Sequence, residues 1–282
     1  MEYKDGKWAR KILELQHKDG SWGFFHTLSN PVPGRPMTTE QALRRLEILG
    51  FTMEDKPIQK TVKYLHDCLT GAEEIPDHKE KGSDWKTYVD LMLSTWIKRF
   101  TADDKYANAV SDKWAELVNS SFFGNKYNQQ EFEFAYHKIF NPENGKRIWG
   151  CMSFYVVSIL ANKMSENIEP LYFDYVLNFP AGVYYYGYNK SVKILPEIFQ
   201  SRKTCTYLRM VDLLASYESK KCRGKLAFVK KWLNANNIGK NEWDLGKNSK
   251  DNILLPLSDS WRDEVDRIKD CSRVVGGILG RL

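Results

Sequence analysis

The amino-acid sequence predicts an all-α protein, and three observations support this. Apolar residues recur three and four positions apart along most of the chain, as on one face of a helix. Short polar loops with Gly, Pro, Asn or Asp separate these stretches, and few segments alternate apolar and polar residues as strands do. No Ser/Pro-rich linker divides the chain, so we expect one domain, residues 1–282, of roughly ten to twelve helices.

The helices follow from local signals. A helix over 38–49 opens with Thr38 and Gln41 in capping-box spacing. The next helix, over 57–69, has Pro57 in its first turn, where a missing N–H costs nothing. The same apolar spacing predicts further helices at about 85–99, 104–119, 129–139, 150–163, 169–177, 204–218, 223–236 and 260–275.

Two segments do not read as helix. The segment "GVYYYGY", 182–188, is aromatic and favours a strand, but a buried loop fits equally well. The C-terminal "VVGGILGRL", 274–282, has three glycines and is predicted to be a loose end or a peptide packed on the body.

The net charge of +6 comes from 42 basic and 36 acidic residues spread along the chain. The densest basic stretch, 219–232, is interpreted as a solvated helix face, and no nucleic-acid partner is expected. No apolar run reaches the length of a membrane span, so no transmembrane segment is expected.

The cysteines are five in number, scattered, and without a CxxC pair. This favours free buried thiols over a disulfide scaffold or a structural zinc site. The N-terminal stretch "MEYKDGKWARK" has no apolar core of a signal peptide, so a cytoplasmic location is expected.

The segment "ELQHKDGSWGFF" places Gln16, Gly20 and Trp22 in the spacing Q-x3-G-x-W. A helix is expected to end just before Gln16, and Gly20 permits the sharp turn that must follow. Trp22 is then aimed back at the body, and the Gln16 amide can bond exposed main-chain groups. Such a unit would tie one helical pair to the next.

The same spacing recurs. In "WLNANNIGKNEW", Trp243 aligns with Trp22, Asn241 takes the Gly position and Asn237 the Gln position. Asn is the next-best residue for a left-handed turn. Leu233 then aligns with Ile12. A more degenerate third copy is "NFPAGVY", with Asn178, Gly182 and Tyr184, which suggests an array of helical hairpins.

The segment "LQHKDGSWG" resembles the QW motif of the terpenoid cyclases and protein prenyltransferases. The resemblance covers about residues 8–70, with a weaker echo at about 223–262, and Lys11 stands where that family usually has an aromatic residue. It implies an α/α toroid, in which helical hairpins form two concentric rings around an aromatic-lined cavity. Its implied occupant is an apolar small molecule or a peptide.

The catalytic motifs of those families are missing. No D-x-D-D or D-D-x-x-D motif occurs, and Asp103-Asp104 is interpreted as a helix N-cap. Three consecutive residues on a helix point about 100° apart, so His66, Asp67 and Cys68 cannot all ligate one zinc ion. No metal or cofactor is expected, and whether the chain is an enzyme stays open.

Two segments are candidates for ligand binding. Aromatic rings with phenolic tips could line a cavity or belong to the core, and the first candidate segment supplies Tyr184, Tyr185, Tyr186 and Tyr188. The second candidate comprises Asp259, Trp261 and Arg262, near Asp244 in irregular chain, with Ser258 or Asp259 as the expected cap of the last helix. We expect Asp259 in an ion pair, with Arg262 as its candidate partner.

Three functions remain open. The favoured hypothesis is a non-catalytic module that binds an apolar ligand or a partner. The first alternative is a terpenoid cyclase-like or prenyltransferase-like enzyme acting on an isoprenoid. The second is a carbohydrate-active toroid enzyme, whose aromatic residues would stack on sugars. Fold-level analogy alone does not decide among them.

Overall fold

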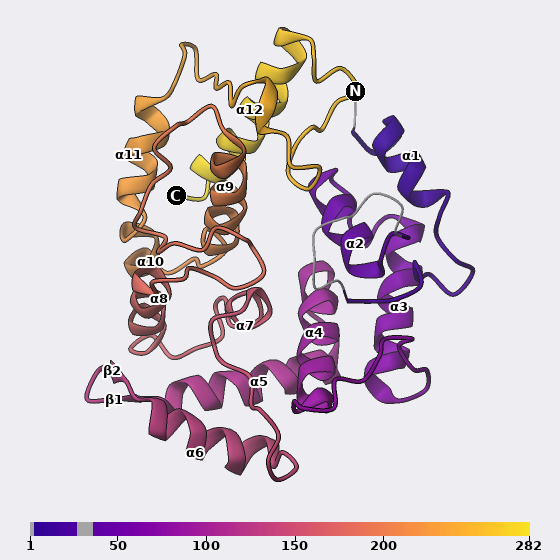
Figure 1. The fold of residues 1–282 in the computed structure, drawn as a ribbon, viewed down its shortest axis with the longest axis vertical. Helices are drawn as coiled ribbons and strands as arrows, with labels where there is room; N and C mark the ends of the chain where they lie inside the picture. Colours follow the sequence, from indigo (N-terminus) through magenta and orange to yellow (C-terminus); the bar gives the residue numbers. More distant parts are fainter. Residues whose placement is uncertain (1–2, 27–35) are drawn as a thin grey trace. The chain divides into compact units, whose positions relative to one another are not determined.

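The structure is a computed structural model that describes residues 3–26 and 36–282 (Figure 1). It confirms the all-α prediction: within these ranges twelve α-helices dominate, and the only strands form one short hairpin of β1 (Phe122–Phe123) and β2 (Lys126–Tyr127). The chain divides into two compact units. Unit 1 comprises 1–117 and 133–150, and unit 2 comprises 118–132 and 151–282. The single domain and the toroid stay predictions.

Unit 1 is built on helices that pack around large aromatic and leucine side chains, with Trp96, Trp114 and Tyr136 fully buried. Within this unit α3 and α4 lie side by side (Figure 1). As predicted, Thr38 and Gln41 form a capping box at the start of α2. The helices that lie wholly or mostly here are α1 (Lys7–Leu13), α2 (Thr39–Ile48), α3 (Lys56–Thr70), α4 (Trp85–Phe100), α5 (Lys105–Ser120) and α6 (Gln129–Phe140), after a short 3-10 turn at Tyr3–Asp5.

Unit 2 has shorter helices and a core of tyrosine and phenylalanine, including Tyr172, Phe173 and Tyr217. A long irregular segment, residues 179–201, joins α8 to α9, and we call it the α8–α9 connection. The helices are α7 (Phe154–Ile159), α8 (Glu169–Asn178), α9 (Arg202–Leu214), α10 (Lys220–Gly224), α11 (Ala227–Ala235) and α12 (Glu264–Leu279), with a 3-10 turn at Lys247–Ser249.

Two predicted helices are shorter than expected. The predicted helix 150–163 is formed only as α7. The main-chain oxygen of Met152 accepts the N–H of Tyr184, and Ser153 caps the helix that follows. The predicted helix 223–236 is divided into α10 and α11 near Gly224, a poor helix former.

The C-terminal region also differs from prediction. The last helix begins at Glu264, and its cap is Asp263, whose carboxylate accepts the N–H groups of Val265 and Asp266. Ser258 and Asp259 are therefore not the cap. The glycine-containing tail is helical through Leu279, because burial of Val275 and Ile278 on one helix face offsets the low helix propensity of glycine.

Candidate functional site

The Gln16 side chain links the first turn to α3. Its Nε2 lies 3.0 Å from the main-chain oxygen of Pro57, 3.0 Å from Oγ1 of Thr61 and 3.1 Å from the oxygen of Gly20. Thr61 Oγ1 in turn donates to the Gly20 oxygen at 2.8 Å. The amide therefore joins the end of α1 to the first turns of a helix more than forty residues later in the chain.

Gly20 lies against the backbone of α3. Its φ is +97°, and a Cβ at this position would lie 2.7 Å from the carbonyl carbon and oxygen of Lys60. Trp22 is only 3% exposed, and its Nε1 donates to the oxygen of Ile12 at 2.7 Å. The turn is thus held by a side-chain amide, a close backbone approach and a buried indole.

The second copy repeats the indole geometry. Trp243 is 3% exposed, and its Nε1 donates to the oxygen of Leu233 at 2.7 Å. In both copies the main-chain N–H of the tryptophan also donates to a hydroxyl of a later helix, at 2.9 Å to Thr39 and at 3.0 Å to Ser272. Leu233 and Ile12, which align in the sequence, therefore accept the equivalent hydrogen bond from the tryptophan of their own turn.

The two turns differ at the other positions. Asn241 has the left-handed φ of +58° but is exposed, and the side-chain Oδ1 of Asn237 accepts locally from the N–H of Gly239. At Gly20 the absence of a side chain lets the backbone of α3 approach the turn. Asn241 has a side chain at the equivalent position. The third copy lacks the motif's geometry, since Tyr184 is 64% exposed.

The four candidate tyrosines divide between core and surface. Tyr186 and Tyr188 are buried, whereas Tyr185 is half-buried and Tyr184 exposed. Tyr185 has a φ of +77°, so the segment is not extended and does not alternate as a strand would. The Arg209 guanidinium lies 5.3 Å from the Tyr186 ring centroid.

The α8–α9 connection is held by bonds to its main chain. The hydroxyl of Tyr188 donates to the oxygen of Ile194 at 2.6 Å, and the hydroxyl of Tyr207 donates to the oxygen of Val192 at 2.9 Å. Arg209 Nη2 donates to the oxygen of Tyr186 at 3.2 Å. The connection is therefore irregular but fixed from inside by side chains of the unit core.

The same connection exposes large apolar side chains. Tyr184, Ile194 and Ile198 are 64%, 49% and 68% exposed. Sequence reasoning found Tyr184 but missed both isoleucines. The sequence did contain a signal for these isoleucines. They lie on either side of Pro196 in a long stretch without helix periodicity, and long connections of this kind are often functional.

The residues of the predicted C-terminal site differ in burial, and the ion pair expected for Asp259 stays a prediction. Asp259 and Arg262 are exposed, whereas Trp261 is buried and its Nε1 donates to the oxygen of Lys247 at 2.9 Å. A buried ion pair of the same region is formed by Asp244 and Arg267.

Arg267 binds Asp244 through two parallel hydrogen bonds, Nε to Oδ1 and Nη2 to Oδ2, each 2.8 Å long. The Arg267 hydrogen bonds hold the pKa of Asp244 below its ordinary value despite burial. A second buried pair joins Arg209 Nη1 to Asp251 Oδ2 at 3.1 Å. Asp251 Oδ1 also accepts three main-chain N–H groups, from Ile253 to Leu255.

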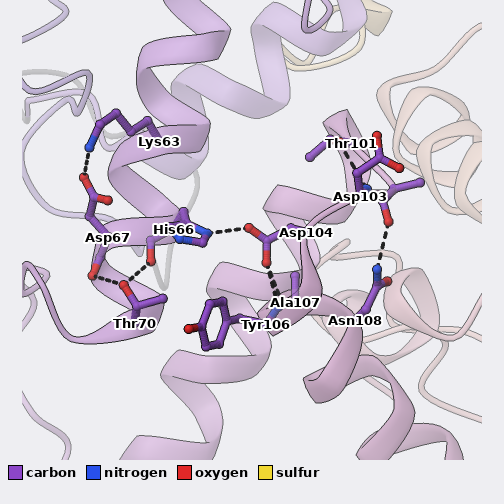
Figure 2. A network of polar contacts seen from close by, with 11 residues as sticks. Lys63, His66, Asp67, Thr70, Thr101, Asp103, Asp104, Tyr106, Ala107 and Asn108 are labelled. Carbon is purple, nitrogen blue, oxygen red and sulfur yellow. Dashed lines mark hydrogen bonds and ion pairs between the residues drawn. The ribbon is translucent and has the colours of Figure 1, made fainter.

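His66 of α3 forms a pair with Asp104, directly before α5 (Figure 2). His66 Nδ1 lies 2.5 Å from Asp104 Oδ2, while Asp104 Oδ1 accepts the N–H groups of Tyr106 and Ala107 and so caps α5. Burial raises the pKa of Asp104, but the hydrogen bonds from Ala107 and His66 outweigh it and the pKa lies below its ordinary value. The neighbouring Asp67 carboxylate pairs with Lys63.

His26 and Tyr88 form another hydrogen-bonded pair in unit 1, through Nε2 and the phenol oxygen. Burial lowers the pKa of His26, and the carboxylates of Glu40 and Asp77 act against this shift. The Tyr88 ring stacks on Trp149 at 4.2 Å between centroids. A neutral imidazole bonded to a phenol can accept or pass a proton.

The buried carboxylates accept hydrogen bonds from groups of their own unit. Each accepts hydrogen bonds from main-chain N–H groups, arginines or other side-chain donors of the same unit. The residues are Glu40, Asp84, Glu169, Asp244, Asp251 and Asp270. Hydrogen-bond donors stabilise an ionised carboxylate. Two of the six differ from the rest: burial raises the pKa of Glu169, and Oδ1 of Asp270 has no hydrogen-bond partner in the described part of the chain.

Comparisons of the chain with protein-family models, curated proteins and solved structures find no match. Within residues 3–26 and 36–282, no cluster of three or more His, Cys, Asp or Glu side chains could hold a metal ion. Over the same described ranges, none of the helices combines the length and the apolar character needed to cross a bilayer.

Proposed function

We propose that this chain is a binding module that holds an apolar group on the α8–α9 connection. The observation that carries the proposal is the combination of a fixed main chain with the exposed side chains of Tyr184, Ile194 and Ile198. Exposed apolar side chains on a rigid segment lose little entropy on binding, which favours affinity.

The contacts of Asp244 and Asp251 support binding over cyclase chemistry. Protonation of an alkene requires a protonated carboxylic acid that can reach the substrate, whereas these two carboxylates accept hydrogen bonds from arginine side chains and main-chain N–H groups. The α/α toroid with a central cavity remains part of the proposal as an expectation from the QW-like turns.

The test uses a neutral solvatochromic dye that fluoresces on apolar surfaces. The full chain should bind the dye saturably, and Ile194→Ser/Ile198→Ser should lose this binding. The matched control is Ile238→Ser/Val265→Ser, which removes two other exposed apolar side chains of unit 2, 54% and 74% exposed. Equal loss in both double variants would contradict a specific surface.

A second candidate function is acid–base catalysis on an isoprenoid at the His26–Tyr88 pair. The observation that favours it is the hydrogen bond between the half-buried imidazole of His26, whose pKa is lowered, and the phenol of Tyr88. Turnover of an isoprenoid diphosphate that is lost in His26→Gln but kept in His78→Gln would support it. His78 is an exposed histidine of the same unit and serves as the control.

A further inference from the structure

The surroundings of the exposed apolar residues are basic. Lys190 and Lys193 lie between Tyr184 and Ile198 in the connection, and Arg202 and Lys203 follow at the start of α9; all four are exposed. Glu197 is the only acidic residue from 182 to 203. The segment therefore carries a local net charge of +3, from four basic residues and one acidic residue.

Helix α11 (Ala227–Ala235) contacts the end of the connection. The Phe199 ring, at the end of the connection, contacts the Trp232 ring at 5.1 Å between centroids, which places the connection beside α11. Trp232 is preceded by Lys230 and Lys231, which are both exposed. The contact thus places α11 beside the end of the connection, and the two lysines directly precede the contact residue in the sequence.

We infer that the α8–α9 connection binds an acidic peptide segment whose apolar side chains contact Ile194, Ile198 and Tyr184. This inference rests on the proposed function and names the class of partner. The lysines attract carboxylates of the peptide by charge complementarity, and apolar side chains of the peptide cover the exposed isoleucines. Tyrosine and isoleucine presented on a fixed main chain suit a peptide contact, because little is ordered on binding.

Side chains of the α8–α9 connection can be replaced without removing the hydrogen bonds that shape it. The bonds that shape it use the main-chain oxygens of Ile194 and Ile198, which accept from Tyr188, Ser201 and Thr204. Replacing the side chains leaves these acceptors in place. Lys190→Glu/Lys193→Glu reverses two exposed charges, and Lys220→Glu/Lys221→Glu makes the same change in net charge on α10 of unit 2, where both lysines are exposed.

The probe is a fluorescein-labelled synthetic peptide in which glutamates alternate with leucines, measured by anisotropy with the full chain. Binding should weaken roughly tenfold when the peptide's glutamates become lysines or its leucines become serines. Ile194→Ser/Ile198→Ser and Lys190→Glu/Lys193→Glu should lose a similar factor, whereas Ile238→Ser/Val265→Ser and Lys220→Glu/Lys221→Glu should not. Added salt should weaken binding.

The outcomes separate the two proposals. Dye binding that depends on Ile194 and Ile198, together with equal affinity for acidic and basic peptides, overturns only the acidic partner. Absence of both dye and peptide binding overturns the proposed function as well. Sedimentation with phosphatidylserine-containing vesicles but no peptide binding would replace the peptide by an anionic bilayer and overturn the inference.

Discussion

The Trp243 indole donates to the main-chain oxygen of Leu233 at 2.7 Å. Trp22 makes the same bond with Ile12, at the same length and the same separation of ten residues. Two segments far apart in the chain therefore fold into one local design: a helix, a left-handed turn and a buried tryptophan that closes back on the helix. What differs is the surroundings, because the turn at Gly20 is covered by α3 and the turn at Asn241 is exposed.

Replacing Trp22 by alanine should lower the free energy of unfolding by about 3 kcal/mol, since it empties a large buried site and leaves the Ile12 oxygen without its indole donor. Chemical denaturation measures this. Phe134→Ala, at an exposed aromatic of the same unit, is the control and should change stability by less than about 0.5 kcal/mol. Equal stability of the two variants would refute a structural role for Trp22.

Gly20→Ala should destabilise the protein more than Gly71→Ala. Both glycines have a positive φ, +97° and +80°, so both variants bear the cost of a left-handed alanine, about 1 kcal/mol. Only at Gly20 does the new Cβ meet backbone, that of Lys60 at 2.7 Å; nothing lies within 4 Å at Gly71. Thermal melts compare the two, and similar melting temperatures would show that α3 does not approach the turn this closely.

Asp104→Ala should cost about 1 kcal/mol, because two N–H groups at the start of α5 lose their acceptor. Asp103→Ala is the adjacent control, since the Asp103 side chain is exposed and does not cap the helix. The free energy of unfolding should therefore fall in the first variant and stay within about 0.5 kcal/mol in the second. The reverse order would mean that the cap has been assigned to the wrong aspartate.

The Asp244–Arg267 pair should make stability depend on pH. The folded-state pKa of Asp244 is lowered, so its contribution is fully present above the ordinary carboxyl pKa and is lost as pH falls through the lowered value. In Asp244→Asn the part of the stability loss at acidic pH that comes from Asp244 should disappear. The variant should nevertheless be less stable at neutral pH, because Arg267 stays buried without a charged partner. Unfolding free energies measured across acidic pH test this, and parallel curves for parent and variant would contradict it.

The sequence predicted much of the fold because helical signals are local. The capping box at Thr38 and the apolar spacing of α3 depend only on neighbouring residues, and both were confirmed. The start of α12 was missed because its cap is chosen by tertiary contacts: Ser258 bonds Asp270, which leaves Asp263 to cap the helix. Local signals cannot report such a competition.

The candidate site was predictable only in part. The run of tyrosines drew attention to the α8–α9 connection, but burial of Tyr186 and Tyr188 depends on α9 side chains such as Arg209 and Tyr207. The partner of Arg267 could not be predicted either, because Asp244 and Asp259 are both acidic residues of the same irregular stretch. Long-range contacts decide which of them is buried.

Methyl NMR of isoleucine-labelled full-length chain, titrated with the neutral dye, tests the central claim most directly. The methyl signals of Ile194 and Ile198 should shift saturably, whereas that of Ile238, also exposed in unit 2, should not move. Shifts at Ile238 of the same size, or unmoved signals of Ile194 and Ile198 while the dye binds, would contradict a binding surface on the α8–α9 connection.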